Sequence, residues 1–376
     1  MNFLEKIAIY ALTICICLSC ANVNRRSPEA FSEVVYTPQH ATGFEIRADE
    51  HGNTLIRVTR PWQGEALVEQ TLAIFSSEAE AEGYEGQHIV GHAERVVCMS
   101  TSHIAMFDAI GRCEAVVGVS GKQYVMNEAV AGNPDVADVG YDSNLNYELL
   151  AMIAPDLVLM YGVTAENTAV TAKLREVGIP YLYLGDYTEQ SPLGKAEWMV
   201  AIAEIAGCRS HGEELYGGVV ERYEAVRESM AEVEHRPRVM LNTPYQDVWY
   251  MPSDDSYLVR LLEDGGAEYI YKGMNPTGGS RGISLEEAYN LVSEADIWLN
   301  VGQCSMLDEL RASAPHFCTT DVVVSGEVYN NNRRRTAAGG SDFWESAIVR
   351  PDVVLSDIAA IVTGNDATLY YHHKLK

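Results

Sequence analysis

The sequence predicts an α/β protein with two three-layer α/β lobes separated by a long helical connector. From Arg95 onward, short apolar segments such as "RVVCM", "AVVGVS" and "DLVLMY" alternate with segments of helical length. This alternation is typical of βαβ units and parallel sheets. The stretch "NYELLAMIAPDLVLMYG" at 146–162 has a looser echo, "SLEEAYNLVSEADIWLNVG" at 284–302, which indicates two similar lobes. A length of 376 residues is also typical of two lobes.

The N-terminus reads as a leader. Its apolar run, from Ile7 to Leu18, is too short for a membrane span, which needs roughly 20 residues, and suits a signal peptide. We therefore expect a signal peptide at 1–19. Ser19-Cys20 resembles a bacterial lipobox, in which the cysteine becomes lipidated. An ordinary cleaved signal with an incidental cysteine is the alternative.

The rest of the chain divides by composition. "FEIRADEHGNTLIRVTR" has two alternating runs around His51-Gly52-Asn53, which predicts a β-hairpin. After Pro192, two helical patterns follow one another without an intervening strand. The predicted order is a lipid-proximal linker (20–43), a small β prelude (44–90), an N-terminal lobe (91–190), a helical connector (191–235) and a C-terminal lobe (236–376).

Composition excludes some functions. The chain has 53 acidic and 27 basic residues and a formal net charge of −26, so it lacks the cationic surface that nucleic-acid binding needs. The cysteines beyond the leader are scattered and have no CxxC spacing, which argues against a disulfide framework or a zinc site. We expect no metal site and no intrinsic cofactor.

The repeated unit carries one acid in the same place in each copy. Asn146 and Ser284 are good N-cap residues, and each is followed two residues later by a glutamate, Glu148 and Glu286. A first-turn acid complements the helix dipole, worth about 0.3–1 kcal/mol, so each glutamate alone has a structural explanation. Their equivalent positions, one on each lobe and on the exposed face of its helix, point to a shared role.

Four segments in this order carry a resemblance to a known family. They are "RVVCMSTSHIAMFDAIGRCEAVVGVSG", "NYELLAMIAPDLVLMYG", "DVWYMPSDDSYLVRLLEDGGAEYIY" and "SLEEAYNLVSEADIWLN". The chain from about Arg95 to its end resembles the substrate-binding proteins of ABC importers, in the class that binds ferric siderophores, haem or cobalamin. The resemblance implies two lobes joined by a single long helix, with the ligand cleft between them. The prelude lies outside the usual core of that family.

The resemblance also implies partners and a location. In such proteins one surface glutamate on each lobe docks onto arginines of the permease, and Glu148 and Glu286 match those positions. We therefore expect an ABC permease with its ATPase as partners and a metal chelate (ferric siderophore, haem or corrinoid) as ligand. The protein is expected to be a monomer on the periplasmic side of a bacterial membrane, anchored through Cys20.

Ligands of open α/β sheets bind outside the carboxyl ends of the strands, so residues in those loops are the candidate ligand contacts. They are Ser100, Ser102, His103, Tyr124, Asp142, Asn144 and Tyr161 in the first lobe, and Trp249, Tyr250, Thr277, Ser280, Asn300, Asn330 and Arg333 in the second. Aromatic and hydroxyl groups suit a large amphipathic ligand, and arginine would suit an anionic one. Three have structural alternatives: His103 as a helix-start residue, Trp249 as core and Arg333 in an exposed loop.

Two other functions stay open at this level. One is a lipid-anchored protein that captures a ligand without an importer. The other is a hydrolase that uses Ser100 or Ser102 with His103, although the sequence has no GxSxG elbow to hold a serine nucleophile.

Overall fold

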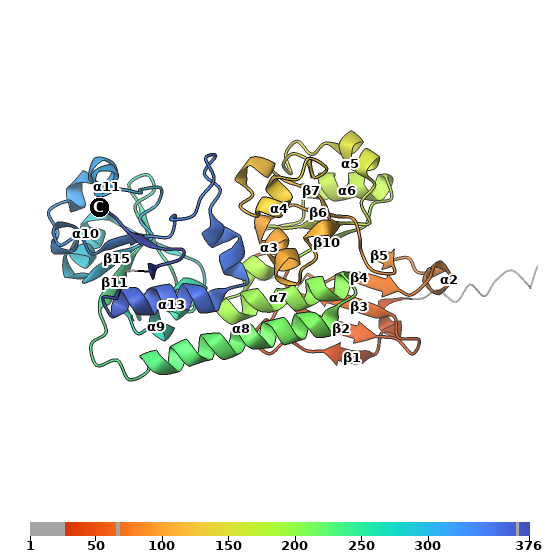
Figure 1. Cartoon of the computed structure of the whole chain (residues 1–376), viewed down its shortest axis with the longest axis horizontal. Coiled ribbons are helices and arrows are strands. Elements are labelled where there is room, and N and C mark those ends of the chain that lie inside the picture. The colour runs from red at the N-terminus through yellow and green to blue at the C-terminus, as the bar shows by residue number, and fades with distance from the viewer. Residues whose placement is uncertain (1–26, 65–67, 366–367) are drawn as a thin grey trace, which may run out of the picture.

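The computed structural model describes residues 27–64, 68–365 and 368–376, so the predicted signal peptide and Cys20 lie outside it. It contains two α/β lobes, a pair of long helices along one side of them, and a further β-sheet beside the N-terminal lobe (Figure 1). The prediction of two α/β lobes is confirmed.

The N-terminal lobe is built on a five-stranded parallel sheet of order β10-β9-β6-β7-β8. Every residue of β9 is buried, as expected for a parallel sheet covered on both faces. The strands are β6 (Val96–Cys98), β7 (Val116–Val119), β8 (Ala137–Asp138), β9 (Leu157–Met160) and β10 (Tyr181–Tyr183), and the helices are α3 (Thr101–Ala109), α4 (Glu128–Ala131), α5 (Tyr147–Ile153) and α6 (Thr168–Glu176).

The C-terminal lobe repeats this plan with the sheet order β13-β11-β15-β16-β17, in which only the β16–β17 pair is antiparallel. The strands are β11 (Arg238–Leu241), β13 (Glu268–Tyr269), β15 (Ile297–Leu299), β16 (Val328–Asn330) and β17 (His373–Lys374), and the helices are α9 (Tyr257–Asp264), α10 (Leu285–Glu294), α11 (Leu307–Ser313), α12 (Asp321–Val324) and α13 (Pro351–Val362). β12 (Trp249–Met251) and β14 (Arg281–Ile283) form a separate antiparallel pair.

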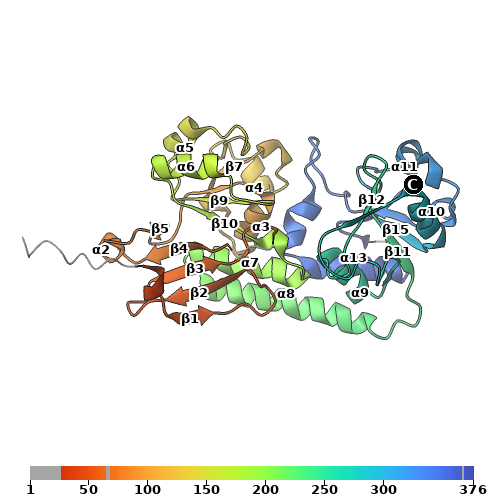
Figure 2. The ribbon, with the colours of Figure 1, turned by 180° about the vertical axis from the view of Figure 1, so that it is seen from behind.

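The connector holds two helices. α7 (Pro192–Ile205) is almost wholly buried and packs against α3 and against α8 (Arg209–Met230). The chain reverses between them at Gly207, whose φ of 71° suits a glycine after a helix end. α8 then runs along both lobes and leads into β11 (Figures 1 and 2).

The prelude is a five-stranded sheet of order β1-β2-β3-β4-β5, larger than the hairpin that the sequence indicated. Its β2–β3 hairpin pairs Phe44 with Val58, where the alternating pattern predicted it. β1 lies inside the segment that was predicted to be the 20–43 linker. The sequence did not indicate this strand, because its four residues show no alternation between buried and exposed positions. The elements are β1 (Glu33–Tyr36), β2 (Phe44–Ala48), β3 (Thr54–Val58), β4 (Gln70–Phe75), α2 (Glu78–Ala81) and β5 (His88–Val90).

Two buried glutamates fasten this sheet to the connector. The Glu197 carboxylate, on α7, accepts hydrogen bonds from the backbone N–H groups of Gln39, His40 and Ala41, each at 2.7 Å, and from the Tyr36 hydroxyl at 2.8 Å. Glu189 likewise accepts from the backbone at 42 and 43 and from the indole of Trp198. The sheet is therefore an integral part of the molecule.

Candidate functional site: the cleft between the lobes

The carboxyl ends of β11, β15 and β16 open into a cavity of about 240 Å³. Its lining is mostly uncharged and polar: Asn242, Leu258, Asn300, Gly302, Gln303, Asn331, Asn332, Arg335, Gly339, Ser341 and Trp344. This is the place where open α/β sheets bind ligands. Of the residues predicted to contact ligand, Asn300 lines this cavity.

Two asparagines at neighbouring strand ends adopt a left-handed backbone. Asn242 follows β11 with φ of 68°, and Asn300 follows β15 with φ of 61°. The Asn242 side-chain amide donates to the Tyr250 carbonyl at 3.2 Å, and the backbone carbonyl of Asn242 accepts from the Trp298 indole N–H at 2.7 Å. The Oδ1 of Asn300 is buried and has no hydrogen-bond partner within the described chain.

Residues 334–346, which we call the interlobe segment, cross from the C-terminal lobe to the N-terminal lobe. Gly340 lies so close to the N-terminal lobe that a Cβ there would come within 2.0 Å of the Tyr124 carbonyl oxygen. The Trp344 carbonyl accepts from Thr101 Oγ1, at the start of α3, at 3.4 Å. The indole of Trp344 is 51% exposed and lines the cavity.

Glu345 completes the attachment of the interlobe segment. Its carboxylate accepts hydrogen bonds from the backbone N–H of Met126 at 2.8 Å and of Asn127 at 2.6 Å, just before α4. Burial raises the pKa of Glu345 to about 7. The neighbouring lobes are thus joined by a carboxylate that is 2% exposed.

The N-terminal lobe contributes tyrosines at its strand ends. Tyr124, Tyr141 and Tyr161 are 37%, 43% and 39% exposed, and the rings of the first two lie over Gly121, whose missing side chain makes room for them. Asp142 is half-buried, and burial raises its pKa. Its Oδ1 has no hydrogen-bond partner among the described residues. These groups form an aromatic, hydrogen-bonding surface.

The helix that follows β6 turns its first residues inward. Ser100 caps α3, and its hydroxyl lies 2.9 Å from that of Ser102. Ser102 is buried, so the prediction of Ser102 as a ligand contact is wrong. His103 is fully buried, with Nε2 3.8 Å from Asp186 Oδ1, and that histidine lowers the pKa of Asp186 against the effect of burial. The prediction of His103 as a cleft residue is wrong, because an apolar helix face carries it into the core. A hydrolase that used Ser100 or Ser102 with His103 in the cleft would therefore lack an accessible general base.

Trp249 is also a core residue, contrary to the prediction. It is fully buried, donates its indole N–H to the Leu241 carbonyl at 2.8 Å, and stacks near Trp298 and Phe317 at ring distances of 5.5 and 5.3 Å. Because side chains alternate along a strand, Trp249 points inward while its neighbour Tyr250 is exposed.

Two more predicted contacts serve the structure of the C-terminal lobe. Asn330 is fully buried, and its amide donates to the carbonyls of Gly302 and Cys304 at 2.9 and 2.7 Å. Arg333 donates to the Leu369 carbonyl and does not line the cavity. Arg335, two residues further along the chain, lines the cavity instead.

The remaining predicted contacts are accessible but lie outside the residues that line the cavity. Asn144 is exposed and accepts from the Tyr141 backbone N–H, which shapes the loop that carries Asp142. Thr277 and Ser280 are exposed in the loop before β14. Sequence reasoning missed Trp344 and Asn242; the one available signal was a tryptophan in a short polar stretch, "SDFWES".

Glu148 and Glu286 lie where the repeated unit predicted them, exposed in the first turns of α5 and α10. Asn146 and Ser284 cap these helices by accepting from the backbone N–H of Leu149 and Glu287. The predicted helix starts are confirmed.

Residues 96–331 match the model of a family described as periplasmic binding protein. Two uncharacterised lipoproteins of Methanocaldococcus jannaschii are similar in sequence. One is 26% identical over 71% of this chain and 64% of its own length. The other is 22% identical over 64% of this chain and 62% of its own length. The chain thus spans somewhat less than two thirds of those relatives.

Solved structures share the fold. A periplasmic haem-binding protein of Pseudomonas aeruginosa is 17% identical, with a TM-score of 0.57 over 76% of this chain and 98% of that one. A siderophore-binding protein of Vibrio cholerae is 17% identical (TM-score 0.53, 72% and 100% covered), and a vitamin B12-binding protein of the same organism is 12% identical (0.51, 73% and 99%). The chain belongs to the periplasmic binding protein family.

Proposed function

We propose that this protein is the extracytoplasmic substrate-binding component of an ABC importer, which captures a metal chelate in the interlobe cleft and delivers it to a permease. The observation that carries this proposal is the polar cavity at the strand ends of the C-terminal lobe, together with the exposed tyrosines that follow strands of the N-terminal lobe. Glu148 and Glu286 dock the loaded protein onto arginines of the permease.

The cleft favours a ligand with a neutral or cationic periphery. Of the three consecutive arginines, Arg334 is paired with Asp342 at 2.6 Å and Arg333 is held by a backbone carbonyl, which leaves Arg335 alone in the cavity. Asparagine amides supply the other polar contacts, and the whole chain carries a net charge of −26. A corrinoid or a hydroxamate-type ferric siderophore fits this surface better than haem, whose two propionates need cationic partners.

The ligand contacts that we propose follow from accessibility. They are Ser100, Tyr124, Tyr141, Asp142 and Tyr161 from one lobe, and Asn242, Tyr250, Asn300, Arg335 and Trp344 from the other. Flat apolar ligands gain most from exposed aromatic rings, so Trp344 is the anchor.

We propose that a lipid on Cys20 holds the protein, as a monomer, at the outer face of the cell membrane. No helix within 27–64, 68–365 and 368–376 is long and apolar enough to cross a membrane. The names of the two Methanocaldococcus relatives support a lipid anchor.

A thermal-shift screen tests the ligand proposal. Cyanocobalamin, cobinamide and ferrioxamine B are expected to raise the melting temperature, and to raise it further as their concentration increases above Kd, whereas haem and ferric citrate are expected to raise it little. Stabilisation by haem alone would overturn the preference for a neutral or cationic ligand.

Replacing Trp344 by alanine is expected to weaken binding of the ligand found by that screen by about 2 kcal/mol, or roughly thirtyfold in Kd, because the contact area of an exposed aromatic anchor is lost. Isothermal titration calorimetry measures the change. Tyr289→Ala removes another exposed aromatic ring of the same lobe, on α10, and serves as the control that keeps full affinity. Equal affinity in Trp344→Ala and the control would contradict the role of Trp344.

A further inference from the structure

A second cavity, of about 630 Å³, lies on the other side of the interlobe segment from the cleft. Its walls come from α3 and the start of α4 in the N-terminal lobe, from α7 and α8 in the connector, and from residues 334–350 of the C-terminal lobe. Side chains of the interlobe segment divide between the two cavities: Ser341 and Trp344 line the cleft, whereas Asp342 and Glu345 line the second cavity.

The floor of this cavity is apolar. Ala105, Met199, Leu215, Val219 and Val349 line it, and all of these except Leu215 belong to the buried core that joins the connector to the lobes. Its volume lies within the range of about 300–1,000 Å³ that is typical of small-molecule sites.

The charges around this floor are unbalanced. Arg222 and Arg334 line the cavity, but each is already paired, with Asp352 and Asp342 respectively, at 2.6 Å. Arg350 stacks on the Tyr370 ring at 5.1 Å. Asp108, Glu128, Glu214 and Glu345 also line the cavity, and none of them forms an ion pair with a lysine or arginine in the described residues.

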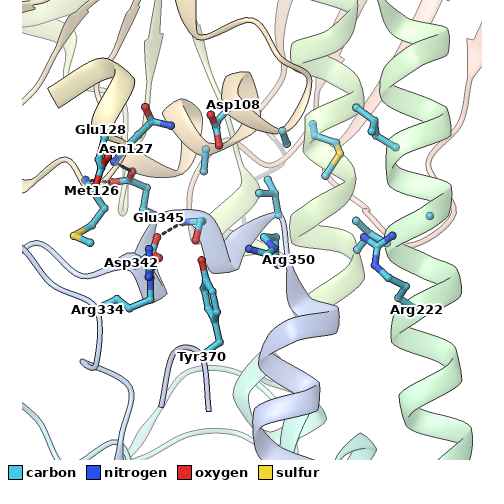
Figure 3. Close-up of a pocket in the computed structure, with 18 of the residues that line it drawn as sticks. Asp108, Met126, Asn127, Glu128, Arg222, Arg334, Asp342, Glu345, Arg350 and Tyr370 are labelled. Carbon is cyan, nitrogen blue, oxygen red and sulfur yellow. Dashed lines mark hydrogen bonds and ion pairs between the residues drawn. The ribbon is translucent and has the colours of Figure 1, made fainter. Parts of the chain in front are cut away.

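Glu345 is the most informative of these acids, because it is a buried carboxylate that faces the cavity without a cation. Figure 3 shows it between Asp108 and Glu128 on one side and Arg350 and Tyr370 on the other. Its pKa is raised to about 7 by burial first, and also by the charges of Asp342 and Asp108. The other ionisable groups around the cavity are Glu128, Glu214, His211, Arg222 and Arg334. A buried carboxylate is stabilised when a positive charge is placed beside it.

We propose that the second cavity is a binding site for a small aliphatic di- or polyamine, distinct from the ligand cleft. The four unpaired acids lie on separate elements, α3, α4, α8 and the interlobe segment, and they surround an apolar floor. That arrangement fits several ammonium groups joined by methylene chains. It does not fit a metal ion, because the described residues contain no cluster of three or more potential ligands.

Binding in the second cavity affects the cleft, because residues of the interlobe segment line both cavities. An ammonium beside Glu345 stabilises its charged form, which accepts from the backbone of Met126 and Asn127 and so holds the two lobes together. This consequence rests on the proposed function of the cleft, whereas the binding itself does not.

Calorimetry of the full chain with spermidine and putrescine tests the site. One molecule is expected to bind, more weakly at high salt, while uncharged 1,6-hexanediol does not bind. Asp108→Asn combined with Glu128→Gln is expected to lower the affinity for spermidine about tenfold, because two charge-assisted contacts are lost. Glu232→Gln, which removes an exposed acid outside the cavity, is the matched control.

A second readout separates this site from general attraction to an acidic protein. Because the pKa of Glu345 is raised to about 7, an ammonium beside it is expected to release protons on binding near neutral pH, seen as a binding enthalpy that depends on the buffer. Glu345→Gln is expected to abolish that release. Absence of binding at millimolar spermidine, or equal loss of affinity in the double variant and in Glu232→Gln, would overturn the site. Neither result would touch ligand binding in the cleft, which the thermal-shift screen tests.

Discussion

Alanine at both Glu148 and Glu286 is expected to abolish uptake of the ligand while its affinity for the purified protein stays unchanged. Both side chains are exposed, one on each lobe, and neither lines the cleft cavity. If each glutamate pairs with a permease arginine, truncation costs about 2–5 kcal/mol of docking energy per pair, which is more than tenfold each. The measurement is uptake of labelled ligand by cells whose own copy is replaced by the variant, beside calorimetry of the purified variant.

Glu287→Ala is the control for that experiment. Glu287 is also an exposed acid in the first turn of α10, so its removal takes away a similar interaction with the helix dipole. Uptake is expected to survive in this variant. Normal uptake in the double Glu148/Glu286 variant would contradict the docking role, and would favour a lipid-anchored protein that captures its ligand without an importer.

Replacing Glu197 by glutamine is expected to lower the free energy of unfolding by about 3 kcal/mol. One carboxylate oxygen accepts from Tyr36 and Gln39 and the other from His40 and Ala41, so an NH₂ group in either place faces two donors. Those buried groups then lose their acceptor, and the loop between β1 and β2 is released from α7. Chemical denaturation followed by circular dichroism measures the change.

Glu221→Gln, an exposed position on α8, is the matched control and is expected to change stability by less than about 0.5 kcal/mol. Equal stability of the two variants would show that the additional sheet is not held by Glu197. The carboxylate clamp would then contribute little to the attachment of this sheet.

The repeated unit and the strand–helix alternation were readable because they depend on local patterns. Asn146 and Ser284 cap their helices through contacts three residues away, and β9 is apolar throughout because it lies inside a parallel sheet. Such signals involve residues that are close in sequence, so a single sequence contains them.

The cleft was less predictable because its residues are brought together from distant segments. His103 and Trp249 have the right chemistry beside strand ends, yet helix and strand geometry turns both into the core. Trp344 reaches the cleft only because Gly340 and Glu345 fix the interlobe segment against residues more than 200 positions earlier. A short stretch of sequence does not carry that information.

The central claim is that the ligand lies in the cleft beside Trp344. Anomalous diffraction from the metal of the bound chelate, cobalt for cobinamide or iron for ferrioxamine B, tests it most directly. The account predicts one strong peak per molecule, between the Asn242–Asn300 floor and the tyrosines of the N-terminal lobe. A peak in the second cavity beside Asp108, or elsewhere on the surface, would contradict it.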